Sequence, residues 1–269
     1  MKWTALRIRE CKGVQKVVCL TAGDFSTARL LDEAGMHLVL VGDSLAMTLL
    51  GYETTLPVTM EEMLHHTSSV ARAVKSALVV ADMPFMSYQV SIEQALTNAG
   101  RFIKEAGADA VKIEGGRIRE ECVKALTANG IPVLGHIGLT PQSIRVMGGY
   151  KIQGRLPAEA EALLADAEAL DKAGVFAIVL ECVPRDLAAR ITASVSVPTI
   201  GIGAGVSCDG QVLVTHDLLG IASSVAPSFA KHYAEVGATM LSAFTAYRDD
   251  VAAGRFPGVE HSFPRDPSA

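Results

Sequence analysis

The chain has 269 residues, of which 49% are hydrophobic and 20% charged, and its formal net charge is −5. A chain of this length and composition can bury a substantial core as one large domain or as two ordinary ones. Its acidic balance, with no extended run of lysines or arginines, does not offer the positive surface that nucleic acids and anionic membranes bind. We therefore expect neither of them as a partner.

The sequence also indicates a compartment. Residues 1–13 mix charged side chains with few apolar ones, unlike a signal peptide, and no later run of about 18 apolar residues predicts a membrane span. Five cysteines without C-x-x-C spacing indicate reduced thiols rather than a disulfide framework or a zinc site. We expect a cytoplasmic protein. The cysteines are Cys11, Cys19, Cys122, Cys182 and Cys208.

Short apolar segments rich in β-branched residues recur along the chain and predict buried parallel strands. In the clearest, residues 36–44, an apolar run ends in Gly42, Asp43 and Ser44. Successive strand ends lie about 30 residues apart, the length of one βα unit. The expected strands cover residues 17–21, 36–44, 78–82, 110–114, 131–136, 176–181, 198–202 and 211–214.

Helix signals separate these strands. Asp24 is a candidate N-cap of the first helix, and Thr59 with Glu62 forms a capping-box pattern at the start of the second. We expect loops over residues 45–58 and 137–155. The expected helices cover residues 25–34, a segment that begins near residue 59, 91–106, a segment that ends at residues 129–130, 158–172, 184–194 and 227–250.

Seven or eight βα units predict a parallel sheet closed into a (β/α)8 TIM barrel, which we expect to form a single domain over residues 1–269. The alternative is an open Rossmann-like sheet. It is disfavoured because the glycine cluster at residues 201–205 comes late in the chain and lacks the G-x-G-x-x-G spacing. That cluster is suited either to holding a phosphate or to letting a cofactor approach the backbone closely.

Ionisable and polar residues follow the apolar part of five consecutive expected strands. In a barrel the carboxyl ends of the strands meet at one mouth, so residues that end different strands become neighbours. Charged surface loops are the alternative explanation, but the inner surface of a barrel is otherwise apolar. The candidate site residues are Asp43, Ser44, Asp82, Lys112, Glu114, His136 and Glu181.

Four of these residues are carboxylates, which repel one another unless a cation is present. Oxygen ligands suit Mg²⁺ and do not suit zinc. We expect Asp43 and Asp82 to bind Mg²⁺ directly, and Glu114 to bind it directly or through water. His136 opens a loop, which favours a hydrogen bond to substrate over metal ligation or a purely structural role.

Lys112 lies two residues before Glu114, so both side chains point to the same side of their strand. A lysine among carboxylates stays protonated and can bind an anionic group, which predicts a substrate with a carboxylate. A Schiff-base lysine would need a lowered pKa, which these acidic surroundings disfavour. Glu181 follows apolar residues, which can desolvate its carboxylate and make it a general base. Alternatively, Glu181 has a structural role, in which it pairs with Arg185 or caps the next helix.

These residues lie in motifs that resemble the ketopantoate hydroxymethyltransferase (3-methyl-2-oxobutanoate hydroxymethyltransferase) family and run in family order from about residue 17 to residue 263. One departure is Gly23-Asp24-Phe25, where the family usually has Tyr-Asp-Tyr or Tyr-Asp-Phe. The matching stretches are residues 41–45, 55–59, 81–86, 111–116, 135–143 (Gly-His-Ile-Gly-Leu-Thr-Pro-Gln-Ser), 148–151, 180–184, 201–205 and 260–263.

The resemblance implies a (β/α)8 barrel of the phosphoenolpyruvate/pyruvate superfamily, with Mg²⁺ at Asp43, Asp82 and Glu114. It implies that Asp43, Ser44, Asp82 and Lys112 contact a 2-oxo acid, and that Glu181 is the base. It also implies 5,10-methylenetetrahydrofolate as the one-carbon donor and a cytoplasmic homo-oligomer, often a decamer. Within that reaction, His136 is expected to hydrogen-bond the new hydroxyl group.

Two other functions remain open from the sequence. A carbon–carbon lyase or phosphonopyruvate mutase of the same superfamily would share the metal carboxylates, although the Lys-Cys-Gly-His lid of the isocitrate-lyase type is absent from the sequence. A barrel that binds a 2-oxo acid without catalysis is the second alternative, and metal-dependent exchange of the C3 proton would exclude it.

Overall fold

The computed structural model describes residues 2–221 and 227–264. The chain divides into two compact units, residues 1–215 and 216–269. The expectation of one domain over residues 1–269 stays a prediction. Within the described ranges, no helix has both the length and the apolar character needed to cross a membrane.

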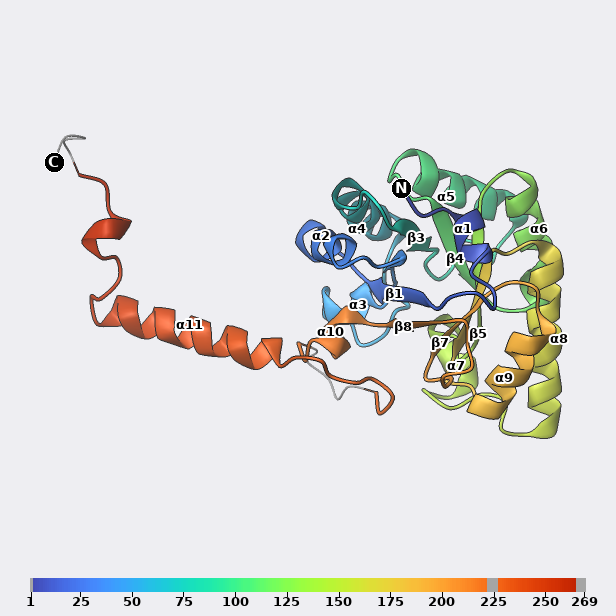
Figure 1. Cartoon of the computed structure of the whole chain (residues 1–269). Coiled ribbons are helices and arrows are strands. Elements are labelled where there is room, and N and C mark those ends of the chain that lie inside the picture. The colour runs from blue at the N-terminus through green and yellow to red at the C-terminus, as the bar shows by residue number, and fades with distance from the viewer. Residues whose placement is uncertain (1, 222–226, 265–269) are drawn as a thin grey trace. The chain divides into compact units, whose positions relative to one another are not determined.

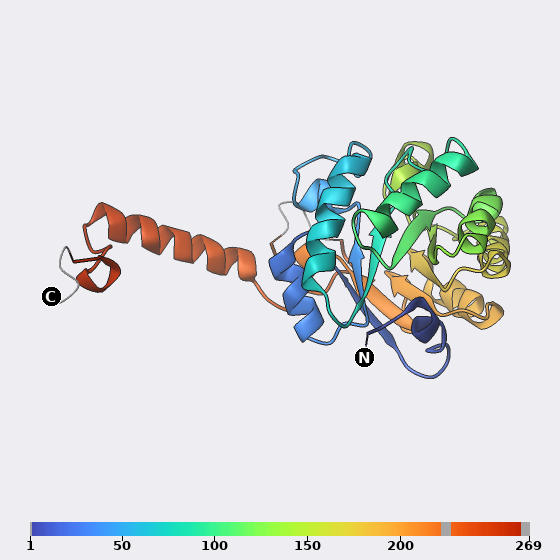
Figure 2. The same cartoon turned by 90° about the horizontal axis from the view of Figure 1, so that it is seen from above.

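The first unit is a barrel of eight parallel strands in which each strand pairs with the next and β8 pairs with β1 (Figure 1). This confirms the predicted (β/α)8 barrel and rules out the open sheet. Seen from above, the helices lie outside the strands (Figure 2). The strands are β1 (Val17–Thr21), β2 (Leu38–Val41), β3 (Leu78–Asp82), β4 (Ala110–Glu114), β5 (Val133–Gly138), β6 (Ala177–Glu181), β7 (Thr199–Ile202) and β8 (Gly210–Leu213).

The predicted helix starts are confirmed at two caps. The side chain of Asp24 accepts a hydrogen bond from the Thr27 backbone N–H, and Thr59 and Glu62 form the expected capping box. The helices are α1 (Ala5–Arg9), α2 (Phe25–Glu33), α3 (Leu45–Thr48), α4 (Met60–Ala73), α5 (Ile92–Lys104), α6 (Glu120–Ala128), α7 (Ile144–Met147), α8 (Pro157–Ala173), α9 (Arg185–Ser194), α10 (Thr215–Leu218) and, in the second unit, α11 (Val236–Ala252).

The structure corrects the sequence-based prediction at two kinds of place. The expected loops contain α3 and α7, which have four residues each and are too short to show a helical period. In the second unit the helix begins at Val236, not near residue 227. The reason is that the N–H of Tyr233 donates to the carbonyl of Leu218 and so is not used for a helical bond, and the N–H of Val236, at the first position of α11, donates to the carbonyl of Leu219.

Most of the strands are buried on both faces, as expected where a barrel interior lies on one side and helices on the other, whereas β1 and β8 expose Val18 and Gln211. All residues of β2, β3, β4 and β5 are buried. Because the strands are parallel, their carboxyl ends share one mouth and their amino ends the opposite face. The candidate site residues are therefore held by rigid elements.

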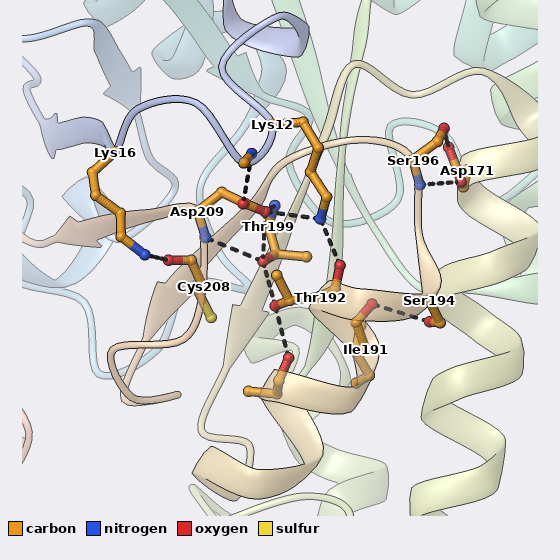
Figure 3. Close-up of polar contacts among 12 residues, drawn as sticks. Lys12, Lys16, Asp171, Ile191, Thr192, Ser194, Ser196, Thr199, Cys208 and Asp209 are labelled. Carbon is orange, nitrogen blue, oxygen red and sulfur yellow. Dashed lines mark hydrogen bonds and ion pairs between the residues drawn. The ribbon is translucent and has the colours of Figure 1, made fainter.

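The amino ends of the strands carry a buried polar network around Asp209, which is 8% exposed (Figure 3). Its carboxylate accepts hydrogen bonds from the backbone N–H groups of Thr199 at 2.9 Å and Gly13 at 3.3 Å. Lys12 Nζ lies 2.9 Å from Asp209 Oδ2 and also donates to the Thr192 carbonyl. This network ties the segment before β1 to the starts of β7 and β8, where the barrel closes.

Candidate active site

The structure brings the charged candidate residues together at the carboxyl ends of β2 to β6. The strand register places Asp82 beside Lys112, Glu114 beside His136, and Gly138 beside Glu181. Glu181 is only partly buried, whereas the others are nearly inaccessible to solvent. The residues that are at most 5% exposed are Asp43, Asp82, Lys112, Glu114 and His136.

Asp82 joins the ends of β2 and β4. Its Oδ1 lies 2.8 Å from Lys112 Nζ, and its Oδ2 accepts a hydrogen bond from the Asp43 backbone N–H at 3.0 Å. Burial lowers the pKa of Lys112, but the charges of Asp82, Glu114 and Asp43 outweigh it and raise this pKa above its usual range. Lys112 is therefore a permanent cation in the site.

The pocket holds more negative charge than this one lysine balances. Burial, followed by the charges of Asp82 and Glu114, raises the pKa of Asp43 to about 8. The raised pKa of Asp43 shows that a further negative charge is unfavourable there even with Lys112 and the imidazole of His136 nearby, so a third cation would be needed for all the carboxylates to ionise together. This is the electrostatic environment in which a divalent cation is stabilised.

His136 lies between two carboxylates. Its Nε2 is 3.1 Å from Glu181 Oε2, and its Nδ1 is 3.6 Å from Glu114 Oε1. Burial and the charge of Lys112 lower the pKa of His136, but contacts with Glu114 and Glu181 raise it, and the balance is about 9. The imidazole is therefore charged at neutral pH, and it holds Glu181 at the mouth of the barrel.

Gly138 fixes the backbone behind Glu181. Its φ is +94°, and a Cβ at this position would lie 2.2 Å from the Glu181 carbonyl oxygen. The next N–H, that of Leu139, donates to the same carbonyl at 2.8 Å. Only glycine allows β5 to approach β6 this closely.

Ser44 and the glycine-rich turn lie at other strand ends. Ser44 is partly buried and precedes α3, and a Cβ on Gly42 would lie 2.9 Å from its hydroxyl, so Gly42 leaves room for it. In the turn over residues 201–205, the Gly205 carbonyl accepts a hydrogen bond from Gln211 Nε2 at 2.9 Å. A Cβ on Gly205 would lie 2.7 Å from Arg185 Cβ, so Arg185 packs on this turn.

The family departure at Gly23 has a counterpart in the structure. A Cβ built on Gly23 would lie 2.4 Å from Leu49 Cδ1, so the Leu49 side chain occupies the space into which a side chain at residue 23 would extend. The carbonyl of Gly23 accepts a hydrogen bond from His66 Nδ1 at 2.6 Å. The missing aromatic ring is thus replaced in part by an aliphatic side chain from the end of α3.

Sequence reasoning did not single out Gln142 or Tyr88. Gln142 Nε2 donates to Asp43 Oδ2 at 3.0 Å, and Tyr88 Oη donates to Gln142 Oε1 at 2.8 Å. Gln142 offered one signal, because it follows a strand that bears a site residue and lies in a matching family motif. Tyr88, in the long segment after β3, offered none.

The donor chemistry of the site suits Mg²⁺. Among the described residues, no three His, Cys, Asp or Glu side chains form a group that could hold a metal ion together. Mg²⁺ does not require one, because it often takes one or two protein carboxylates and completes its shell with water and substrate. Two observations favour a cation here. One is the raised pKa of Asp43, and the other is that Glu114 Oε1, although 3.6 Å from His136 Nδ1, is buried and accepts no hydrogen bond within the described ranges.

Comparison with known proteins identifies the family. The family model described as ketopantoate hydroxymethyltransferase matches residues 2–259. The 3-methyl-2-oxobutanoate hydroxymethyltransferase of Moorella thermoacetica is 57% identical over 249 residues, which are 93% of each chain. The protein of the same name from Syntrophus aciditrophicus is 55% identical over 249 residues, which are 93% of this chain and 92% of that one.

Solved structures show the same architecture at low sequence identity. The chain superposes on 2,3-dimethylmalate lyase, a member of the PEP mutase/isocitrate lyase superfamily, with a TM-score of 0.62 and 17% identity. The match covers 100% of this chain and 93% of the lyase chain. This likeness confirms the fold. From the family model and the similarity to named relatives, the chain belongs to the ketopantoate hydroxymethyltransferase family, a family of transferases.

Proposed function

We propose that the protein transfers a hydroxymethyl group from 5,10-methylenetetrahydrofolate to 3-methyl-2-oxobutanoate, forming 2-dehydropantoate (ketopantoate) for pantothenate biosynthesis. The C3–H bond of the 2-oxo acid breaks, and a bond forms between C3 and the methylene carbon. Water supplies the hydroxyl oxygen, and tetrahydrofolate leaves. The observation that carries the proposal is the contact of Glu181 with His136 beside the buried carboxylates at the barrel mouth.

Asp43 and Asp82 would hold Mg²⁺ directly, and Glu114 directly or through water. When bound, Mg²⁺ supplies Lewis-acid polarisation of the substrate ketone, which makes the C3 proton more acidic. The backbone N–H of Asp43 already holds Asp82 Oδ2, which keeps these two carboxylates adjacent. The site is preorganised for a hard cation on this side of the barrel.

Lys112 and Ser44 bind the substrate carboxylate. An ammonium group carries three protons, and the ion pair with Asp82 leaves others for an anionic ligand. The raised pKa of Lys112 supports this charge-based role and argues against a Schiff-base mechanism, which needs a neutral amine. The Ser44 hydroxyl, next to Asp43, donates a hydrogen bond to the same carboxylate.

Glu181 removes the C3 proton. Asp43, Asp82 and Glu114 are each held by backbone N–H groups or other side chains, whereas the ion-pair partner of Glu181 among the described residues is His136. His136 orients the carboxylate and then hydrogen-bonds the new hydroxyl group. A general base alone contributes roughly 10²–10⁴-fold, so polarisation of the ketone must supply much of the remaining acceleration.

We further propose that the enzyme works in the cytoplasm as a homo-oligomer, with a decamer as the family arrangement. Its partners are the small-molecule 2-oxo acid and the folate. This part of the proposal is supported by the family resemblance of the motifs alone. It is tested by the mass of the purified protein in solution.

A turnover assay tests the reaction. The purified chain is incubated with 3-methyl-2-oxobutanoate and methylenetetrahydrofolate, with Mg²⁺ or with a chelator, and ketopantoate is detected by mass spectrometry. We expect product only when Mg²⁺ and the folate donor are both present. Exchange of the C3 proton without product would assign the deprotonation but reject the folate donor. Absence of both exchange and product would leave only a 2-oxo acid binder.

A further inference from the structure

The side chain of Gln142 makes hydrogen bonds to several elements at the mouth of the barrel. It lies on the 3-10 turn Pro141–Ser143 that follows β5, and it is 5% exposed. Its hydrogen bonds reach the ends of β2, β3 and β4. The side-chain Nε2 donates to Asp43 Oδ2 at 3.0 Å and to the Met83 carbonyl at 2.9 Å, and the backbone N–H donates to Glu114 Oε2 at 3.0 Å. The side-chain Oε1 accepts hydrogen bonds from Tyr88 Oη at 2.8 Å and from Gln89 Nε2 at 3.1 Å.

These partners fix which way the amide faces. A backbone carbonyl such as that of Met83 can only accept a hydrogen bond, so the group that faces it must be the NH₂ of Gln142. On the other side, the Gln89 NH₂ can only donate, so it must face Oε1. The two N–H bonds of the amide are both used. Gln142 therefore has no donor left for a substrate, and its role must act through its neighbours.

The contacts divide the oxygens of two carboxylates. Gln142 holds Oδ2 of Asp43 through its side chain and Oε2 of Glu114 through its backbone. The other oxygen of Glu114, Oε1, is buried without a hydrogen-bond partner in the described part of the chain. One oxygen of each carboxylate is thus fixed, which sets the direction of the other.

The loop after β3 supports this arrangement from behind. Tyr88 Oη donates to Gln142 Oε1 and can accept from the Glu114 backbone N–H, which lies 3.2 Å away. A series of hydrogen bonds therefore runs from the Glu114 N–H through Tyr88 and Gln142 to Asp43. Such a series aligns its members cooperatively in a buried site.

We propose that Gln142 is a positioning residue that aims the carboxylates of Asp43 and Glu114 at the divalent cation. The inference rests on the metal site of the proposed function. It assigns Gln142 neither to the cation nor to the substrate. Groups that orient metal ligands commonly contribute 10- to 100-fold to metal affinity or activity.

The test compares Gln142→Met with the unaltered protein. Methionine keeps the volume but removes both hydrogen-bonding groups of the amide, while the backbone N–H to Glu114 remains. Binding of Mn²⁺, a paramagnetic substitute for Mg²⁺, is measured by electron paramagnetic resonance without substrate. We expect the affinity to fall about 10-fold or more. At saturating metal, C3 proton exchange should return to within a few-fold, because Glu181, His136 and Lys112 are unchanged.

Gln153→Met is the matched control. Its Nε2 donates to the Lys151 carbonyl on the exposed part of the loop after α7, so Mn²⁺ affinity should not change. Tyr88→Phe is the second variant. It removes one hydrogen bond to Oε1 but keeps the donations of Gln142, so it should weaken Mn²⁺ binding measurably but by less than about 10-fold. This variant keeps the positioning role testable if Gln142→Met does not fold.

Thermal unfolding is recorded for each variant to confirm that it is folded. Unchanged Mn²⁺ affinity in a folded Gln142→Met or Tyr88→Phe protein would overturn the positioning role while leaving the metal site intact. If the unaltered protein binds no Mn²⁺, the proposed metal site fails, and this inference fails with it. If Mn²⁺ binding is weaker and C3 proton exchange stays low at saturating metal, the positioning role is overturned, and Gln142 takes part in the chemical step instead.

Discussion

His136 Nε2 lies 3.1 Å from Glu181 Oε2 across the neighbouring strands β5 and β6. On its other side, His136 Nδ1 faces Glu114, one of the carboxylates proposed to hold the cation. A single charged imidazole therefore connects the proposed base with the proposed metal site.

Replacement of Glu181 by Gln should stop proton removal but leave metal and substrate binding intact. Glutamine keeps the shape of the side chain and its position near His136, but it cannot accept the C3 proton. We expect C3 hydrogen–deuterium exchange of 3-methyl-2-oxobutanoate, followed by proton NMR in D₂O, to fall at least 10²-fold. Binding of Mn²⁺ and of the 2-oxo acid should be retained. Exchange at the normal rate would remove Glu181 from the role of base.

Asp209→Ala should destabilise the barrel but spare its chemistry. The substitution leaves Lys12 and the Thr199 N–H without their buried acceptor. Because Lys12 is partly exposed and can still reach water, we expect the free energy of unfolding to fall by only about 2–3 kcal/mol. Denaturant unfolding measures this loss of stability. The rate of C3 exchange at 25 °C should stay within about two-fold of that of the unaltered protein, because this network lies at the amino ends of the strands and the site lies at their carboxyl ends.

The control for this experiment is Asp171→Ala, which Figure 3 shows beside Ser196. The Asp171 carboxylate accepts hydrogen bonds from the Ser196 N–H and hydroxyl, both at 2.7 Å, but in an exposed position. Its loss should cost about 1 kcal/mol. Equal destabilisation by the two variants would show that burial of Asp209 adds nothing.

Asp32→Asn should change how stability depends on pH. Asp32 accepts hydrogen bonds from the backbone N–H groups of Lys75, Ser76 and Ala77, which lead into β3. Burial raises the pKa of Asp32, but the three N–H bonds outweigh it and lower this pKa below 3.8. A lowered pKa in the folded state stabilises the fold above the unfolded-state pKa, and this contribution is lost as the pH falls through the folded-state value.

At pH 7 the Asn variant should be less stable by about 1 kcal/mol, and below pH 4 its urea midpoint should approach that of the unaltered protein. Glu33→Gln serves as control. Glu33 pairs with Arg29 on the exposed surface of α2, an interaction of about 0.3–0.5 kcal/mol. A difference between Asp32→Asn and the unaltered protein that stays constant from pH 7 to pH 3 would contradict the role of the ionised carboxylate.

Gly23→Tyr should be tolerated better when Leu49 is shortened. A side chain at residue 23 meets Leu49 Cδ1, so the single substitution should cost about 1–3 kcal/mol through overpacking. In the double variant Gly23→Tyr, Leu49→Ala, the ring can enter the vacated space. We expect the two changes to be coupled favourably by at least about 0.5 kcal/mol in thermal or urea unfolding. Additive effects would mean that the two positions do not share this space.

The sequence predicted the barrel well because each strand carries its own apolar signal. The bounds of β1, β3 and β4 agree with the expected strands, and the charged residues that follow them converge on one mouth. Gln142 could not be recognised in this way. Its partners come from the ends of three other strands, so its importance depends on contacts between loops rather than on a local pattern.

The sequence pattern also could not predict the ion pair between Glu181 and His136. The apolar residues before Glu181 predict a desolvated carboxylate, but the register of β5 and β6 places a charged imidazole against it. In the second unit, residues 227–235 contain apolar residues at helical spacing. The N–H of Tyr233 instead donates to the carbonyl of Leu218, and no local signal identifies that partner.

The pairing of β1 with β8 also affects how the chain can fold while the ribosome synthesises it. Translation at about 5–20 residues per second separates the emergence of these two strands by roughly 10–40 s. Throughout that interval one edge of β1 in the nascent chain has no partner strand, and an unpaired edge is a template for association with other chains. The same pairing that closes the finished barrel therefore leaves the unfinished one with an unpaired strand edge until β8 is made.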